Sequence, residues 1–180
     1  MIDRLRYRIS QGRRHLRSSA PESNALHDLL TAEARARFAT LSNADQQHCL
    51  AVARNLEVLG APPELVAAGL LHDIGKSVPG VPVRLPHRMI KVLLARVSIR
   101  LLHRIAAGNQ PRSPFDGVWV LAHHARYGAE LVRCWGYPER VAWLVEHHED
   151  RPITDRQLAL LVAIDDRLPS IPALTGLAHG

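Results

Sequence analysis

The segment AAGLLHDIGKSVPG, from Ala67 to Gly80, places a histidine and an aspartate directly after an almost purely apolar run. That run is apolar on all sides of a helix, which is typical of a helix in the middle of a bundle. Burying a neutral polar group without a partner costs roughly 2–7 kcal/mol, and an unpaired carboxylate costs more. His72 and Asp73 therefore need a compensating group nearby in the fold.

The hydrophobic periodicity is helical along nearly the whole sequence, and no segment alternates as a β-strand does. We therefore expect an all-α fold, a single-domain helical bundle. Ser42, three residues before Asp45, predicts the cap of the first long helix, and Pro63 starts the central one. The last helix begins at a capping box, TDRQ, at Thr154. The expected helices cover about 42–59, 64–74, 87–107, 118–135, 139–149 and 154–169.

The chain divides into three parts by composition. Residues 1–40 are basic and predict two short amphipathic helices or a mobile arm, residues 41–170 contain the bundle, and residues 171–180 form a tail. The net charge of +6 comes from 21 arginines and two lysines, Lys76 and Lys91. Arginine suits phosphate oxygens, but we interpret most of this charge as a solvated surface.

Two features predict a soluble, cytoplasmic protein. The N-terminal segment lacks the apolar core of a signal peptide, and no window approaches 18 uninterrupted apolar residues. Cys49 and Cys134 are too few for a disulfide framework and too far apart for a metal knuckle.

Four further polar side chains lie on apolar, core-facing stripes of the expected helices, at helical spacing from aliphatic neighbours. These are His48, His124, His148 and Asp165. Their neighbours His123, His147 and Asp166 lie beside these stripes or on weaker ones.

Together with His72 and Asp73, these stripes bring four imidazoles and two carboxylates toward one core. A single core histidine is more often satisfied by a hydrogen bond, but six such positions converge here. Imidazole and carboxylate are ordinary ligands for iron, manganese, zinc and nickel, and helical bundles build metal sites from facing side chains. The pattern predicts a divalent-cation site.

A second His-Asp pair serves as a control. His27 and Asp28 repeat the dipeptide, but no buried run precedes them and no Gly-Lys follows, so we interpret them as a surface or capping pair. The remaining histidines carry no partner pattern and receive no assigned chemistry: His15, His87, His103 and His179.

The sequence resembles the HD-domain metal-dependent phosphohydrolases of the HDIG type. The resemblance rests on His48, the segment LLHDIGK and a late aspartate, and it covers roughly residues 42–168. It implies a helical HD-type fold and a first metal ion that is bound by His48, His72, Asp73 and Asp165.

The segment HHARYGAEL resembles the family's H-P-x-x-G-A-E signature, with its histidine at His124 because Gly128 follows four residues later. In binuclear members this histidine and one near EHHED bind a second ion, which here implies His148. His147 is the alternative to His148, and His147, His123 and Asp166 are candidate additional ligands. We expect one or two divalent ions of iron, manganese, zinc, nickel or magnesium and favour two, with a mononuclear site as the alternative.

The resemblance implies an enzyme that hydrolyses a nucleotide or another small phosphate ester, as a phosphomonoesterase or a phosphodiesterase. Two cations about 3.5–4 Å apart acidify the water that attacks phosphorus. Asp73 would bridge the cations and orient that water, and Lys76 would stabilise charge on the phosphate or leaving oxygen. A helix-end lysine that opposes the dipole is the alternative for Lys76. Arg126 and Arg151 are candidate phosphate ligands.

Departures from the family's branches narrow the substrate. GYP at 136–138 precedes HHED, whereas cyclic-di-GMP phosphodiesterases carry it afterwards, and KSVPG lacks the acidic pair of the branches that hydrolyse guanosine tetraphosphate. The spacing is similar to the branch that cleaves dinucleoside polyphosphates, although a fold-level likeness does not fix a substrate.

Two other functions stay open. One is a catalytically silent signalling or scaffold module that keeps the fold. The other is an adaptor for a membrane surface or nucleic acid, because Arg96, Arg100 and Arg104 line one side of an apolar segment that suits an interfacial helix. For this segment we favour a core helix with a basic rim. As the binding partner we favour a small phosphorylated molecule, in particular a nucleotide, over nucleic acid or a membrane.

Overall fold

The computed structural model describes residues 26, 28–81, 83, 87 and 116–168, and within these ranges it is helical and contains no strand. This confirms the all-α prediction. The expected helix at 87–107 lies outside the described residues apart from His87, as do most of the basic arm and the C-terminal tail. The elements are α3 (Ala32–Phe38), α4 (Asn43–Val58), α5 (Pro63–Leu71), the 3-10 helix η1 (Ile74–Lys76), α8 (Asp116–Cys134), α9 (Glu139–His147) and α10 (Arg156–Asp165).

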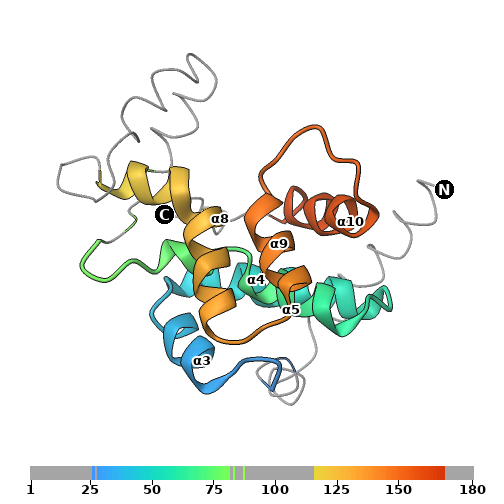
Figure 1. Ribbon diagram of the computed structural model, residues 1–180, viewed down its shortest axis with the longest axis horizontal. Coiled ribbons are helices and arrows are strands. Elements are labelled where there is room, and N and C mark those ends of the chain that lie inside the picture. The colour runs from blue at the N-terminus through green and yellow to red at the C-terminus, as the bar shows by residue number, and fades with distance from the viewer. Residues whose placement is uncertain (1–25, 27, 82, 84–86, 88–115, 169–180) are drawn as a thin grey trace, which may run out of the picture.

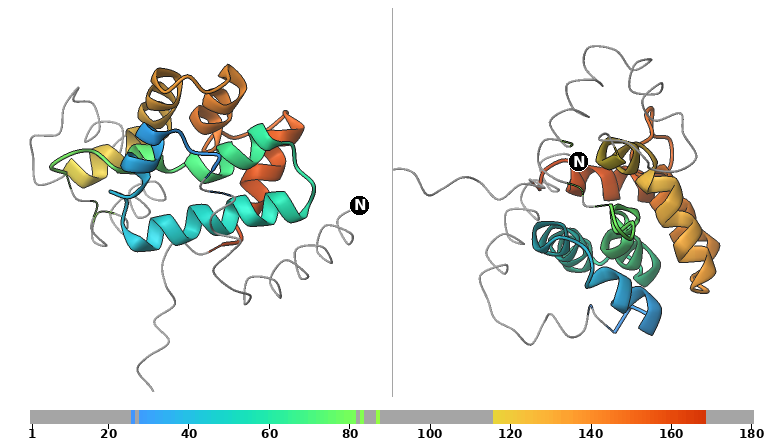
Figure 2. Two further views of the ribbon diagram at one scale, coloured as in Figure 1. Left: turned by 90° about the horizontal axis from the view of Figure 1, so that it is seen from below. Right: turned by 90° about the vertical axis from the view of Figure 1, so that its left-hand side faces the viewer.

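Helix α5 lies in the middle of the bundle, as its uniformly apolar sequence predicts. Every residue from Leu65 to Leu71 is buried. Helix α5 contacts α4, α9 and α10, and α8 packs against both α9 and η1. In Figure 1, α8 and α9 lie in front of α4 and α5, and the left view of Figure 2 shows α5 next to the long helix α4. The segment that follows α5 is therefore held inside the fold.

The central helix ends earlier than the sequence pattern indicates. Helix α5 stops at Leu71, and His72 and Asp73 lie in the turn between α5 and η1, so the expectation of one helix to Ile74 is wrong. Glycine is a poor helix former, and Gly75 makes a close backbone contact with α8 that any Cβ atom would obstruct. The turn lets Asp73 and Lys76 approach α8 and α4.

The caps explain where the neighbouring helices begin. Ser42 caps α4 as predicted, with its hydroxyl accepting the Asp45 N–H at 3.2 Å. The cap of α10 is Asp155 rather than Thr154, because its carboxylate accepts the Leu158 N–H at 2.9 Å and pairs with Arg140 at 2.7 Å. Aspartate caps a helix at least as well as threonine does.

The C-terminal ends of the later helices also differ from expectation. Helix α10 ends at Asp165 instead of Pro169, and α9 ends at His147 instead of Glu149. A proline disfavours helical conformation in the residue before it, so a helix tends to stop short of it.

Part of the predicted N-terminal arm packs into the bundle. Leu30, Ala34 and Phe38 are buried in the same hydrophobic cluster as the central helices. The Tyr137 hydroxyl accepts the Thr31 N–H and donates to the Leu29 carbonyl, both at 3.0 Å. This segment is therefore tied to the domain, while the boundary at residue 41 stays a prediction. No helix among the described residues is long and apolar enough to cross a lipid bilayer.

Candidate metal centre

Six ionisable side chains from five parts of the chain meet in the core. Five of them are buried, as predicted, and Asp165 is partly exposed, with 22% of its side chain accessible. They come from α4, the turn after α5, α8, the end of α9, and α10: His48, His72, Asp73, His124, His148 and Asp165.

Three of these side chains form what we call the first ligand group. The His48 Nε2 atom lies 2.7 Å from Asp165 Oδ1, and the His72 Nε2 atom lies 3.4 Å from the same oxygen. Their ligand atoms lie within 4.8 Å of one another, which is close enough for one metal ion.

Asp73, His124 and His148 form the second ligand group, whose ligand atoms also lie within 4.8 Å of one another. The His124 Nε2 atom lies 3.3 Å from both His148 Nε2 and Asp73 Oδ1. The two groups adjoin, because Asp73 Oδ2 is 3.6 Å from the Nε2 atom of His72. The His72-Asp73 doublet thus contributes one ligand to each group.

Backbone carbonyls fix which ring nitrogens carry hydrogen. The Nδ1 atoms of His72, His124 and His148 contact carbonyl oxygens three residues earlier, at 2.9, 2.9 and 2.7 Å. A carbonyl only accepts hydrogen bonds, so each Nδ1–H is the donor. In the neutral ring the Nε2 atom then carries a lone pair, which is the form that binds a metal.

These tautomers make the second ligand group a good fit for a cation. When both rings are neutral, the Nε2 lone pairs of His124 and His148 face each other and an oxygen of Asp73, 3.3 Å from His124 Nε2 in each case, and such acceptors repel without a positive charge between them. Burial, which disfavours the charged form of the ring, lowers the pKa of His148 to about 3, so its ring stays neutral. A shared divalent ion satisfies all three acceptors at once.

The carboxylates of the cluster are held ionised. Burial opposes ionisation of Asp73, but Lys76 and His72 outweigh it and keep the pKa of Asp73 well below its usual range. Burial likewise opposes ionisation of Asp165, and His72 and His48 more than compensate, so its pKa is also lowered. Burial alone would lower the pKa of His72, but the same two carboxylates raise it to about 9.

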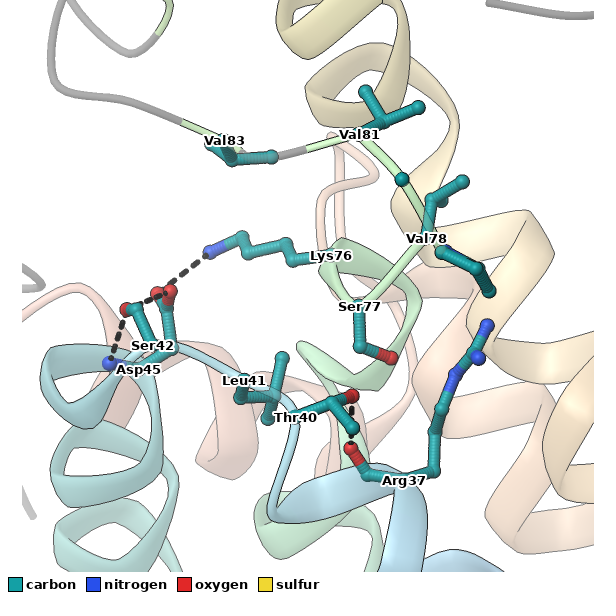
Figure 3. Close-up of a pocket in the computed structure, with 12 residues that line it drawn as sticks. Arg37, Thr40, Leu41, Ser42, Asp45, Lys76, Ser77, Val78, Val81 and Val83 are labelled. Atoms are coloured by element: carbon teal, nitrogen blue, oxygen red, sulfur yellow. Dashed lines mark hydrogen bonds and ion pairs between the residues drawn. The ribbon is translucent and has the colours of Figure 1, made fainter.

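Lys76 connects the cluster to an adjacent pocket. Its ammonium group donates to Asp73 Oδ2 at 2.5 Å and lies 3.8 Å from Asp45 Oδ1. Figure 3 shows Lys76 extending along the pocket toward Asp45 and Ser42, with Arg37 on the other side. The cavity measures about 550 Å³, and among the described residues its lining also includes Thr40, Leu41, Ser77, Val78, Pro79, Gly80, Val81 and Val83.

The candidate additional ligands His147, His123 and Asp166 lie outside the two groups. His123 and His147 stack on Trp119 and Trp143, with ring centroids 4.6 and 4.4 Å apart, and each directs Nδ1 at the carbonyl of its tryptophan. Asp166 is exposed and pairs with Arg151 at 3.2 Å.

The candidate phosphate-binding arginines are engaged elsewhere on the surface. Arg126 is 77% exposed and pairs with Glu130 at 3.2 Å. Arg151 is bound to Asp166 and also donates to the His148 and Asp150 carbonyls. Their role in phosphate binding stays a prediction.

Sequence reasoning missed Cys49 and Asp45 as neighbours of the cluster. Cys49 is fully buried, and its sulfur lies within 4.8 Å of ligand atoms of His72 and Asp73. A free cysteine is usually a small core residue, so nothing in the spacing marked it. Asp45 was recognised only as part of a helix cap, although its proximity to Lys76 also links α4 to the cluster.

Comparison with known proteins agrees with the geometry. Residues 46–170 match the family model of the HD domain. The comparisons with curated proteins and with solved structures find no significant match. The family match spans well over half of the chain and includes the whole cluster from His48 to Asp165. The chain therefore belongs to the HD-domain family, whose members are in general metal-dependent phosphohydrolases.

Proposed function

We propose that this chain hydrolyses a phosphate ester of a nucleotide or another small phosphorylated compound, with divalent metal ions in its core cluster. The observation that carries the proposal is the second ligand group, where the Nε2 atoms of two imidazoles and a carboxylate oxygen lie close together beside Lys76. Such a set of acceptors suits a cation, and the adjacent ammonium group suits a phosphate oxygen.

The first and second ligand groups would each hold one ion, with Asp73 between them. One oxygen of Asp73 faces His124, and the other faces Lys76 and His72. Divalent ions bound there supply Lewis acidity, which lowers the pKa of water and neutralises phosphate oxygens.

The protein's own groups prepare this chemistry in two ways. Ionised Asp73 accepts a hydrogen bond from the attacking water and so orients it toward phosphorus. Lys76 keeps Asp73 ionised and places a positive charge beside the reacting phosphate, where negative charge develops.

The pocket next to Lys76 supports a small substrate rather than a macromolecular one. Its volume of about 550 Å³ is in the usual range for small-molecule sites. Arg37 and Lys76 supply cationic groups, and Val78, Val81 and Val83 supply an apolar wall. This combination suits a phosphorylated molecule with a carbon-rich body, as a nucleotide is.

The test measures turnover of an aryl phosphomonoester, an aryl phosphodiester and a panel of nucleotides by the purified, metal-loaded protein. We expect hydrolysis that a chelator abolishes and added divalent metal restores. Asp73→Asn should lower turnover by at least roughly 100-fold and reduce metal content, because it removes a charged ligand from the second group.

Asp28→Asn is the matched control, because Asp28 belongs to the other His-Asp pair and is exposed. We expect this variant to match the wild type in turnover and metal content. Metal-loaded wild-type protein that turns over none of these compounds, or an Asp73→Asn protein with normal turnover, would contradict the proposed function.

A further inference from the structure

Cys49 supplies a sulfur donor at the edge of the metal centre. Its sulfur and the ligand atoms of His72 and Asp73 lie within 4.8 Å of one another, and all three residues are buried. This third group takes its histidine from the first ligand group and its aspartate from the second. It therefore shares one residue with each ligand group and is identical to neither.

The separations suit a shared tetrahedral ion. With a metal–sulfur distance of about 2.3 Å and a metal–nitrogen distance of about 2.1 Å, two ligands of one such ion lie about 3.6 Å apart. Donor atoms that start within 4.8 Å of one another need to approach by about 1.2 Å at most to reach this separation. Rotation of the Cys49 and Asp73 side chains supplies a movement of this size.

The donor set determines which ions this third group can take. Thiolate sulfur prefers soft or borderline ions such as zinc and cadmium, whereas carboxylate, carbonyl and water oxygens suit magnesium and manganese. A hard ion in the first or second ligand group therefore leaves Cys49 as an uncharged neighbour. A thiophilic ion gains a sulfur bond only by moving toward Cys49.

We propose that Cys49, His72 and Asp73 form an alternative metal site for a thiophilic divalent cation such as Cd²⁺ or Zn²⁺. Binding forms a metal–sulfur bond and breaks the S–H bond of Cys49, and the proton leaves to the buffer. Because the site borrows His72 and Asp73, a thiophilic ion competes with both ligand groups of the hydrolytic centre. Cys49 thus determines which metals the centre tolerates.

The chain offers a background in which the source of any sulfur bond is unambiguous. Its other cysteine, Cys134, is exposed at the end of α8. In Cys134→Ser protein the only remaining thiol is Cys49. After a chelator has removed bound metal from this full-length variant, Cd²⁺ is titrated in and the ultraviolet sulfur-to-cadmium charge-transfer band is recorded.

We expect a band that saturates at about one Cd²⁺ per chain. The same titration with Mn²⁺ should give no band, and the double variant Cys49→Ser, Cys134→Ser should lose the cadmium band. X-ray absorption at the cadmium edge of the Cys134→Ser protein should show sulfur next to the metal. That measurement does not depend on whether the double variant folds.

Bound Cd²⁺ without a charge-transfer band, or with only nitrogen and oxygen neighbours, would overturn the inference, as would a band that survives in the double variant. The inference rests on the metal centre of the proposed function, but its readout is independent of turnover. A Cys134→Ser protein with the band and no hydrolysis refutes only the proposed function. One that hydrolyses but lacks the band refutes only the inference.

Discussion

Replacing Gly75 with alanine tests how the close contact between η1 and α8 holds the metal centre together. A Cβ atom at Gly75 would lie 2.7 Å from Gly128 N and 2.8 Å from His124 C, and closer still to His124 O. Real Cβ contacts are essentially never shorter than 3.0 Å. All of these atoms are backbone, so no side-chain rotation relieves the clash, and η1 must separate from α8.

The separation required is on the order of 1 Å, and it acts directly on the cluster because Asp73 precedes η1 and His124 lies on α8. The 3.3 Å approach of Asp73 to His124 would be lost. Overpacking a core costs about 1–3 kcal/mol and occasionally more, and a rigid backbone clash belongs at the upper end. We therefore expect Gly75→Ala to lower the free energy of unfolding by about 3 kcal/mol or more.

Gly69→Ala is the matched control, because Gly69 is also a buried glycine of the same segment. Its Cβ atom would meet Leu56 Cδ1 at 2.5 Å and Val52 Cγ1 at 3.2 Å, which are side-chain atoms that can move. Alanine also favours the α5 helix over glycine by about 0.8–1 kcal/mol, which offsets part of the crowding. We expect a loss of about 1 kcal/mol or less and unchanged metal content.

Urea unfolding of the metal-free proteins measures the stability change, and elemental analysis of the loaded proteins measures metal content. Gly75→Ala should lose metal as well as stability. A Gly75→Ala protein within about 1 kcal/mol of the wild type and with full metal content would show that the close contact between η1 and α8 does not hold the metal centre together. Equal destabilisation by both substitutions would show that the kind of colliding atom does not matter.

Three further predictions address single side chains. His148→Ala should lower metal content by about one ion per chain, whereas His123→Ala should leave it unchanged. Full metal content in His148→Ala protein would contradict metal binding by the second ligand group. Lys76→Gln removes the ammonium partner of Asp73 and should lower kcat roughly 10- to 100-fold, because a hydrogen bond to a charged group contributes about 1.5–3 kcal/mol. A kcat equal to that of the wild type would assign Lys76 a structural role alone. An ion that binds to the first ligand group must displace the proton of His72, whose pKa is about 9. The affinity of that site, measured by calorimetry on metal-free protein, should therefore rise from pH 7 and level off above that value. An affinity that does not change between these pH values would show that metal binding does not displace a proton from His72. The pKa of His72 is raised on folding, so its contribution to the stability of the metal-free protein is complete below the unfolded value of about 6.5 and is lost as the pH rises through 9.

The sequence predicts those parts of the fold that depend on local pattern. Apolar spacing placed α4, α5, α8, α9 and α10 and showed that His48, His124 and His148 face the core. Burying an imidazole on an apolar stripe is costly, so its position is informative even without a structure.

The parts that escaped prediction depend on contacts between distant segments. The break after Leu71 follows from the approach of η1 to α8, which is not visible in the local sequence. The basic charge of residues 1–40 concealed an apolar face at Leu30, Ala34 and Phe38 that packs into the core. Cys49 resembles an ordinary core residue until the fold brings His72 and Asp73 next to it.

We propose that the buried cluster binds divalent cations in two adjacent ligand groups. Anomalous scattering at the metal edge, from crystals of fully loaded protein, locates these ions directly. We expect one peak among His48, His72 and Asp165 and a second among Asp73, His124 and His148. A single peak would contradict the binuclear centre, and a loaded protein with no peak in the cluster would contradict the metal site itself.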